Sequence, residues 1–321
     1  MALLYPGSPL PLQVTTRHVL LLFVDGLGLG PQDPATNPVA AARTPSLDTL
    51  LGRRLAGIMD RVEHNNVLLI PTDATLGVAG LPQSATGQTA LLTGVNASQL
   101  VGRHVTAYPT AQLRAVLTER NLFAQVKAIG GKVALANAYT DEYFKAVEEG
   151  RLRHAAITFS ALAAGVPLRG MEDLRAGQAV FHDLTNARVR SWGYDVPQIT
   201  PRQAGNNLAG IASEHHLTVF EFFLTDLAAH GRVPQAPVHV IEMLDGVVAG
   251  AVERTDLTRI LIALVSDHGN IEDGGGTTHT RNPVPTLLIG SGRHEVGERI
   301  RSITDIAPAL VDWLAGGLRR G

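Results

Sequence analysis

The chain has 321 residues, of which 45% are hydrophobic and 17% charged, enough for one large α/β domain with a modest insertion and too apolar for extended disorder. Its formal net charge of -2 predicts no surface for nucleic acid or anionic membranes, so we expect small-molecule partners. The absence of cysteine excludes disulfides, thiolate metal sites and a cysteine nucleophile.

The N-terminal segment MALLYPGSPLPLQ has no basic region and contains prolines, so it does not resemble a signal peptide. The apolar run from Val19 to Val24 is far too short to span a bilayer. We therefore expect a soluble cytoplasmic protein without a membrane partner. The sequence does not indicate which oligomeric state the protein adopts.

Short apolar runs that end in polar or glycine-rich turns alternate with helical patterns along the chain. The predicted strands are His18–Val24, Lys132–Ala136, Arg259–Ser266 and Val284–Ile289, and the predicted helices are Ser84–Thr93, Val238–Glu253 and Asp305–Leu314. This alternation predicts an α/β fold, a three-layer sandwich around a mostly parallel central sheet.

Residues 141–205 fit the alternation poorly, because they are rich in arginine, glycine and proline. We interpret this segment as an inserted lid or small cap. Residues 1–140 and 206–321 would then form the core.

Candidate metal ligands follow two of the predicted strands. Asp25 ends the first strand in VDGLGLG, where three glycines leave room around its carboxylate, and Asp267 and His268 end another. Ligands bind at the carboxyl edge of open α/β sheets, so these residues are expected to share a site. For Asp25 alone, a helix cap or a turn is the commoner role.

Two further histidines complete the candidate ligands. Asp226 and His230 are four residues apart and would reach one cation from a single helix face, although a simple intrahelical pair is equally consistent with the spacing. His279 closes the segment SDHGNIEDGGGTTH. Buried imidazoles beside carboxylates are costly without a ligand, which favours metal binding in this segment.

Ser84 lies in PQSATGQTALLTG, where a loop enters a predicted helix. Its hydroxyl would lie near backbone N–H groups that suit an anion such as phosphate, although an ordinary helix N-cap is the alternative. The segments together can hold two divalent cations. One cation would lower the pKa of the Ser84 hydroxyl, and both would neutralise charge on phosphoryl oxygens.

The order of these segments resembles the metalloenzyme branch of the alkaline phosphatase superfamily, which includes cofactor-independent phosphoglycerate mutase and phosphopentomutase. The resemblance covers roughly residues 18–104 and 220–315. It rests on VDGLG, the TPSLD segment from Thr44 to Asp48, SATGQ from Ser84 to Gln88, the Asp226-x-x-x-His230 pair, DHGN from Asp267 to Asn270, and HTRNPVP from His279.

This resemblance implies Ser84 as the nucleophile and two divalent ions, with Mn²⁺ and Zn²⁺ both compatible with the ligands. One metal would take Asp226, His230 and His279; the other would take Asp25, Ser84, Asp267 and His268. Gln88 departs from the histidine usual in the family. Thr86 would be a rival nucleophile if the register were shifted by two residues.

The resemblance leaves the reaction open. The mutases enclose their phosphoenzyme under large caps, whereas only 141 residues separate Ser84 from Asp226 here, which leaves a small lid. We therefore expect hydrolysis of a small phosphorylated substrate through a phosphoserine on Ser84. A phosphomutase and a catalytically silent metal-binding homologue are the alternatives. Arg103, Arg188 and Arg190 are candidates for a second substrate phosphate by charge alone.

Overall fold

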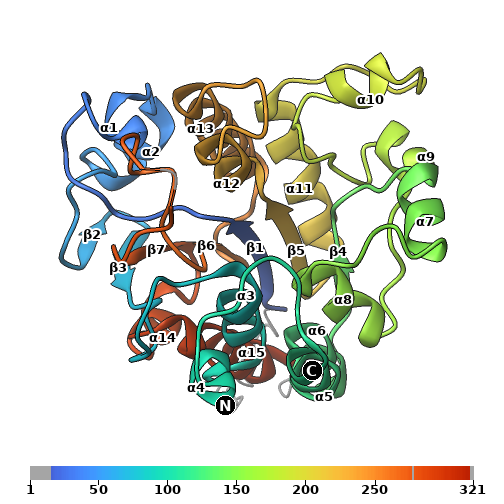
Figure 1. Ribbon diagram of the computed structural model, residues 1–321, viewed down its shortest axis with the longest axis horizontal. Helices are drawn as coiled ribbons and strands as arrows, with labels where there is room; N and C mark the ends of the chain where they lie inside the picture. Colours follow the sequence, from blue (N-terminus) through green and yellow to red (C-terminus); the bar gives the residue numbers. More distant parts are fainter. Residues whose placement is uncertain (1–15, 277, 319–321) are drawn as a thin grey trace, which may run out of the picture.

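The computed structural model describes residues 16–276 and 278–318, and these residues build three layers around a seven-stranded sheet of order β2-β3-β7-β6-β1-β5-β4 (Figure 1). The strands are β1 (His18–Val24), β2 (Val62–His64), β3 (Val67–Thr72), β4 (Val133–Leu135), β5 (Leu217–Phe222), β6 (Ile260–Val265) and β7 (Val284–Gly290). The predicted α/β sandwich with a mostly parallel sheet is confirmed.

The centre of the sheet is parallel, because β1 lies between β5 and β6 and β4 pairs with β5 in the same direction. Strands β2, β3 and β7 add an antiparallel edge. All four predicted strands form, whereas β2, β3 and β5 were not predicted. Pro71 inside β3 is a residue that normally argues against a strand, and it hides this one in the sequence.

Alternate residues of β1 face opposite layers of helices. Leu20 and Leu22 pack in a core with the helices of one face. These helices are α1 (Pro38–Ala41), α2 (Pro45–Leu51), α11 (Pro201–Glu214), α12 (Leu224–Ala229) and α13 (Pro237–Arg254). The predicted helix Val238–Glu253 is α13, extended by one residue at each end.

Leu21 and Phe23 pack in the core of the second face. Its helices are α3 (Ser84–Thr93), α4 (Ala97–Val101), α5 (Ala111–Arg120), α6 (Leu122–Ala128), α8 (Ala156–Ala163), α14 (Arg293–Gly297) and α15 (Ile306–Leu318), with the short 3₁₀ turn Ile303–Asp305 before α15. The predicted helix Ser84–Thr93 has the observed bounds of α3.

Different parts of the segment 141–205 pack in two different cores. Helices α7 (Asp141–Glu148), α9 (Met171–Arg175) and α10 (Ala187–Ser191) lie to one side of the sheet (Figure 1). Leu174 of α9 and Val189 of α10 belong to a small separate core. Helix α8, in contrast, buries Ile157 in the main core of the second face. The domain boundaries stay a prediction, but α8 packs as part of the core.

No helix in the described ranges, 16–276 and 278–318, is both long and apolar enough to cross a membrane.

Candidate metal centre and active site

Three aspartates of the site follow three neighbouring parallel strands. Asp25 comes directly after β1, Asp267 follows β6, and Asp226 lies on α12, just after β5. Because β1 is paired with both β5 and β6, the carboxyl ends of the three strands meet at one edge of the sheet. The predicted convergence of these segments at that edge is therefore present in the structure.

Asp25, Asp267 and His268 form a buried group that we call the first cluster, with ligand atoms within 4.8 Å of one another. His268 Nε2 lies 3.2 Å from Asp25 Oδ1, 3.6 Å from Asp267 Oδ2 and 3.0 Å from Ser84 Oγ. A ring nitrogen carries at most one hydrogen, so it cannot satisfy three oxygens.

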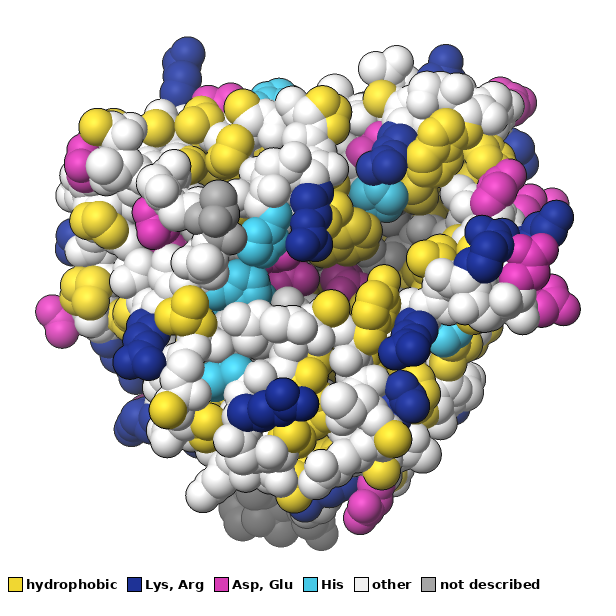
Figure 2. Space-filling view, in the orientation of Figure 1, with side chains coloured by type: hydrophobic (Ala, Val, Ile, Leu, Met, Phe, Trp, Pro, Cys, Tyr) yellow, Lys and Arg dark blue, Asp and Glu magenta, His cyan; other side chains and the backbone are white. Residues whose placement is uncertain are grey.

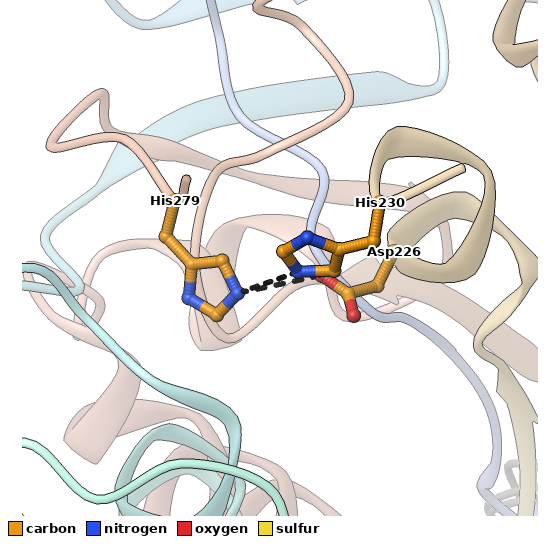
Figure 3. Close-up of side chains that lie close together, drawn as sticks. All are labelled: Asp226, His230 and His279. Carbon is orange, nitrogen blue, oxygen red and sulfur yellow. Dashed lines mark hydrogen bonds and ion pairs between the residues drawn. The ribbon is translucent and has the colours of Figure 1, made fainter. Parts of the chain in front are cut away.

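Asp226, His230 and His279 form the second cluster, again with ligand atoms within 4.8 Å (Figure 3). The Nε2 atoms of the two histidines are 3.3 Å apart, and they lie 3.4 and 3.5 Å from Asp226 Oδ1. His279 Nδ1 is 2.7 Å from the carbonyl oxygen of Pro82, which only accepts hydrogen bonds. With Nδ1 held by this carbonyl, the ring turns Nε2 towards the cluster, as metal-binding histidines do.

The two clusters adjoin each other. The rings of His268 and His279 stack with their centroids 3.8 Å apart. Asn270 links the clusters further, because its Nδ2 donates to Asp226 Oδ1 at 2.7 Å and its backbone continues from His268. The seven side chains predicted to bind metal, Ser84 included, thus lie in one continuous group.

Unpartnered oxygens test whether the site suits cations. Among the described side chains, Asp25 Oδ1, Asp267 Oδ2 and Asn270 Oδ1 are buried and receive no well-aligned hydrogen bond, although His268 Nε2 lies 3.2 Å from Asp25 Oδ1. A buried carboxylate oxygen without a donor is costly, and a divalent cation removes that cost. Carboxylate and imidazole donors suit Mn²⁺ and Zn²⁺ alike, so the residues fit the implied metal ions.

Burial and the charges of the site raise the pKa values of two groups in the first cluster. Burial raises the pKa of Asp267 well above its usual value, and the charge of Asp25 raises it further. Burial alone would lower the pKa of His268, but Asp267 and Asp25 outweigh it and raise the value to about 10. Without a cation, the site therefore retains protons that metal binding would displace.

Ser84 is the first residue of α3, half-buried and in contact with the first cluster. Gly87 allows this approach, because a Cβ there would lie 2.9 Å from the backbone oxygen of Asp267. Fewer backbone N–H groups at the start of α3 are free to bind an anion than the sequence suggested. The carbonyl oxygen of Val105 accepts from the N–H groups of Ala85 and Thr86, at 3.1 and 3.4 Å.

Thr86 and Gln88 of the SATGQ motif have structural roles. Thr86 is fully buried; its hydroxyl donates to the Gln83 carbonyl and accepts from Val105 N, both at 3.2 Å. This engagement argues against Thr86 as the rival nucleophile. Gln88, in place of the family's histidine, lies with Nε2 3.4 Å from Asp25 Oδ2. The amide can orient the Asp25 carboxylate without adding a cationic side chain.

Glu272 stabilises the loops around the site through hydrogen bonds, and it was not recognised in the sequence. Its buried carboxylate accepts from Gly28 N at 2.9 Å, Asn270 N at 2.8 Å and Asn282 Nδ2 at 3.1 Å. It thereby ties the loop after β1 to the loop that carries His279. A Cβ at Gly28 or Gly30 would collide with the Glu272 side chain, and one at Gly26 would press on Asp226, so these glycines make room for Glu272 and Asp226 rather than for Asp25 itself.

A pocket of about 810 Å³ opens from this site, and Asp25, Ser84 and Asp226 form part of its wall. Figure 2 shows the hollow beside the histidines and acidic residues. The three arginines that line it are Arg151, Arg153 and Arg232. The arginines proposed from charge do not: within the described chain, Arg103, Arg188 and Arg190 are absent from the lining, and Arg188 instead covers the ring of Trp192.

Glu221, on β5, is a second residue that sequence reasoning missed; it lies in the pocket wall. Burial raises its pKa from 4.5 to about 8, and the charge of Asp25 contributes. The folded protein therefore keeps a proton between these pH values that the unfolded chain loses. This contribution to stability is present at low pH and is lost as the pH rises towards 8.

In metal-free protein, we expect Glu221→Gln to remove the fall in folding stability that Glu221 causes between about pH 4.5 and pH 8. The slope of unfolding free energy against pH should differ between wild type and variant by about 1.4 kcal/mol per pH unit within the window. Urea denaturation at pH 5, 6, 7 and 8 measures it. The exposed Glu253→Gln is the control and should keep the wild-type slope; parallel curves for wild type and Glu221→Gln would contradict the assignment.

The fold and the two carboxylate–imidazole clusters define the chain as an α/β metalloenzyme. It belongs to the Metalloenzyme superfamily, whose family model matches residues 17–315, within the metalloenzyme branch of the alkaline phosphatase superfamily.

Curated relatives are similar over part of their length. The chain is 31% identical over 129 residues to the 2,3-bisphosphoglycerate-independent phosphoglycerate mutase of Desulforudis audaxviator, covering 38% of this chain and 25% of that one. It is 24% identical over 193 residues to the enzyme of that name from Pyrococcus furiosus, covering 56% and 43%. The chain thus matches about a quarter to under half of these mutases.

Solved structures share the fold along nearly their whole length. A protein from Pyrococcus horikoshii superposes with a TM-score of 0.56 and 16% identity, covering 96% of this chain and 98% of that chain. Alkaline phosphatase from the Antarctic bacterium TAB5 gives 0.53 and 12%, covering 93% and 97%.

Proposed function

We propose that the protein is a metal-dependent phosphomonoester hydrolase that acts through a phosphoserine on Ser84. The observation that carries the proposal is the position of Ser84 Oγ, 3.0 Å from His268 Nε2 at the first cluster and facing the pocket. The substrate would be a small phosphorylated molecule that enters through this pocket.

Two groups of residues would hold the cations. The first cluster with Ser84 would bind one, and the second cluster would bind the other. The bound ions, Mn²⁺ or Zn²⁺, would lower the pKa of the serine hydroxyl and offset the charge of the phosphoryl oxygens.

The reaction would proceed in two displacements at phosphorus. Ser84 Oγ forms a bond to phosphorus while the ester oxygen leaves and takes up a proton as the free alcohol. A water oxygen then attacks the phosphoserine, the Ser84 Oγ–phosphorus bond breaks, and Ser84 regains its proton. One water is consumed for each phosphate released.

The exposure of the pocket supports hydrolysis over transfer. Tyr108, Leu152 and Trp192 line it and are 43%, 41% and 52% exposed, so water reaches the chamber from its rim. A phosphoserine open to water would be hydrolysed rather than kept for transfer to a second hydroxyl.

Phosphomutase activity is the second candidate, because the curated relatives bear the name of phosphoglycerate mutases. A panel of phosphomonoesters assayed with Mn²⁺ and with Zn²⁺ separates the two. We expect inorganic phosphate in stoichiometric amount; an isomerised ester without free phosphate would instead establish the mutase. Absence of phosphoserine from every ester, despite full metal loading, would favour a catalytically silent homologue.

A further inference from the structure

The pocket is much longer than its catalytic end. From Ser84 and Asp226 it continues along the loop after α7 and past the segment that carries Phe181 and His182, and the hollow is visible in Figure 2. Its volume of about 810 Å³ lies in the upper part of the range of about 300–1,000 Å³ typical of sites for drug-sized ligands. A phosphate ester of three carbons would leave most of it unfilled.

Aromatic rings form two walls of this extension. On one side, Tyr139 and Tyr143 lie with ring centroids 4.7 Å apart. Their hydroxyls bond to Thr158 Oγ1 at 2.7 Å and His154 Nδ1 at 2.8 Å, which fixes the orientation of both rings. The tyrosines are therefore held as rigid contact surfaces rather than as free hydroxyl donors.

The other wall consists of Phe181, His182 and Phe223, whose successive ring centroids are 4.0 and 4.9 Å apart. Burial lowers the pKa of His182 to about 4, so this ring is uncharged at neutral pH. Trp192 extends the wall to the rim, edge-on to Phe181 and 52% exposed. Exposed aromatic area of this kind, continuous with a catalytic site, is characteristic of ligand binding.

Positively charged arginine side chains also line the pocket. Arg151 is paired with Glu149 at 2.5 Å, whereas Arg153 and Arg232 form no ion pair with the described residues. Arg232 comes two residues after His230 of the second cluster, and its backbone N–H donates to Leu227. An unpaired guanidinium in a pocket that also contains Asp226 of the second cluster suits a phosphoryl group better than an uncharged ligand.

From these walls, we infer that the substrate is a phosphomonoester whose organic group is large and carries a flat aromatic ring, such as a nucleoside. The ring would lie against these aromatic side chains in the extension while the phosphate lies at Ser84. This inference rests on the proposed hydrolase function and adds the class of its substrate. Stacking on protein aromatics is worth about 1–3 kcal/mol per base, which is sufficient to select such a group.

Two esters of primary alcohols test the inference in the metal-loaded enzyme: adenosine 5′-monophosphate and glycerol 3-phosphate. We expect a kcat/KM at least about tenfold higher for the nucleotide. Trp192→Ala should lower the ratio of the two kcat/KM values, nucleotide over glycerol phosphate, about tenfold. Met59→Ala, which truncates an exposed apolar side chain outside the pocket lining, is the control and should change neither value. Equal kcat/KM for the two esters in wild type would overturn the inference.

Binding separates this inference from the hydrolase proposal. Naphthylmethylphosphonate and methylphosphonate carry the same anion and cannot be hydrolysed, so calorimetry with wild-type protein is independent of turnover. We expect the aromatic phosphonate to bind at least about tenfold more tightly, with the advantage lost in Trp192→Ala. Tight aromatic binding without turnover of any ester would refute the hydrolase alone. Equal affinities would refute the aromatic site alone.

Discussion

Replacement of Ser84 by alanine is expected to lower kcat by roughly 10⁴-fold or more while two metal ions still bind, because the substitution removes the attacking oxygen and leaves both clusters in place. The remaining ligands, Asp25, Asp267 and His268, keep their contacts. Phosphate release measures the first effect. Calorimetric titration with Mn²⁺ or Zn²⁺ measures the second, and a trapped phosphoserine should disappear in the variant.

Thr86→Val is the matched control, since it deletes the hydroxyl of the rival nucleophile two residues away. Turnover should remain within a few-fold of wild type. Stability should fall by about 1–3 kcal/mol, because Val105 N loses its buried acceptor. Full activity in Ser84→Ala, or its loss in Thr86→Val at unchanged metal content, would reverse the two roles.

The candidate ligands could be predicted because they follow strands that are plain in the sequence. HVLLLFV and ILIALV are buried along their whole length, so their composition identifies them, and the polar residues after them fall at the carboxyl edge. Asp226 and His230 could be found only from their spacing and the family resemblance, because β5 was not predicted. That strand contains Glu221, a charged residue in a fully buried pattern, which obscures the apolar run.

The residues around the ligands could not be predicted, for a physical reason. Glu272 acts through backbone N–H groups of distant loops, and such partners leave no mark in the sequence pattern. The pocket arginines show the same limit. Charge alone pointed to Arg188 and Arg190, but Arg190 donates to the Val196 carbonyl and Arg188 covers Trp192. Only the tertiary arrangement shows that Arg153 and Arg232 reach the chamber.

Removal of the metal ions is expected to abolish turnover and to destabilise the protein increasingly as the pH rises. An ion present at 100 times its dissociation constant stabilises the folded state by about 2.7 kcal/mol per site. In metal-free protein, the raised pKa of Asp267 makes stability greatest at low pH and lower as the pH approaches the folded value. Metal binding requires the deprotonated carboxylates, so its stabilising effect grows over the same range.

Thermal unfolding with and without a chelator, at pH 5.5 and pH 8, measures this difference, which should be larger at pH 8. His279→Ala and Asp267→Asn should each reduce the stoichiometry from two ions to one. Their matched controls are the exposed His239→Ala and Asp312→Asn, which should bind two. A chelator effect equal at both pH values, or two ions retained in both cluster variants, would contradict the assignment, because each lost ligand belongs to a cluster of only three ionisable side chains.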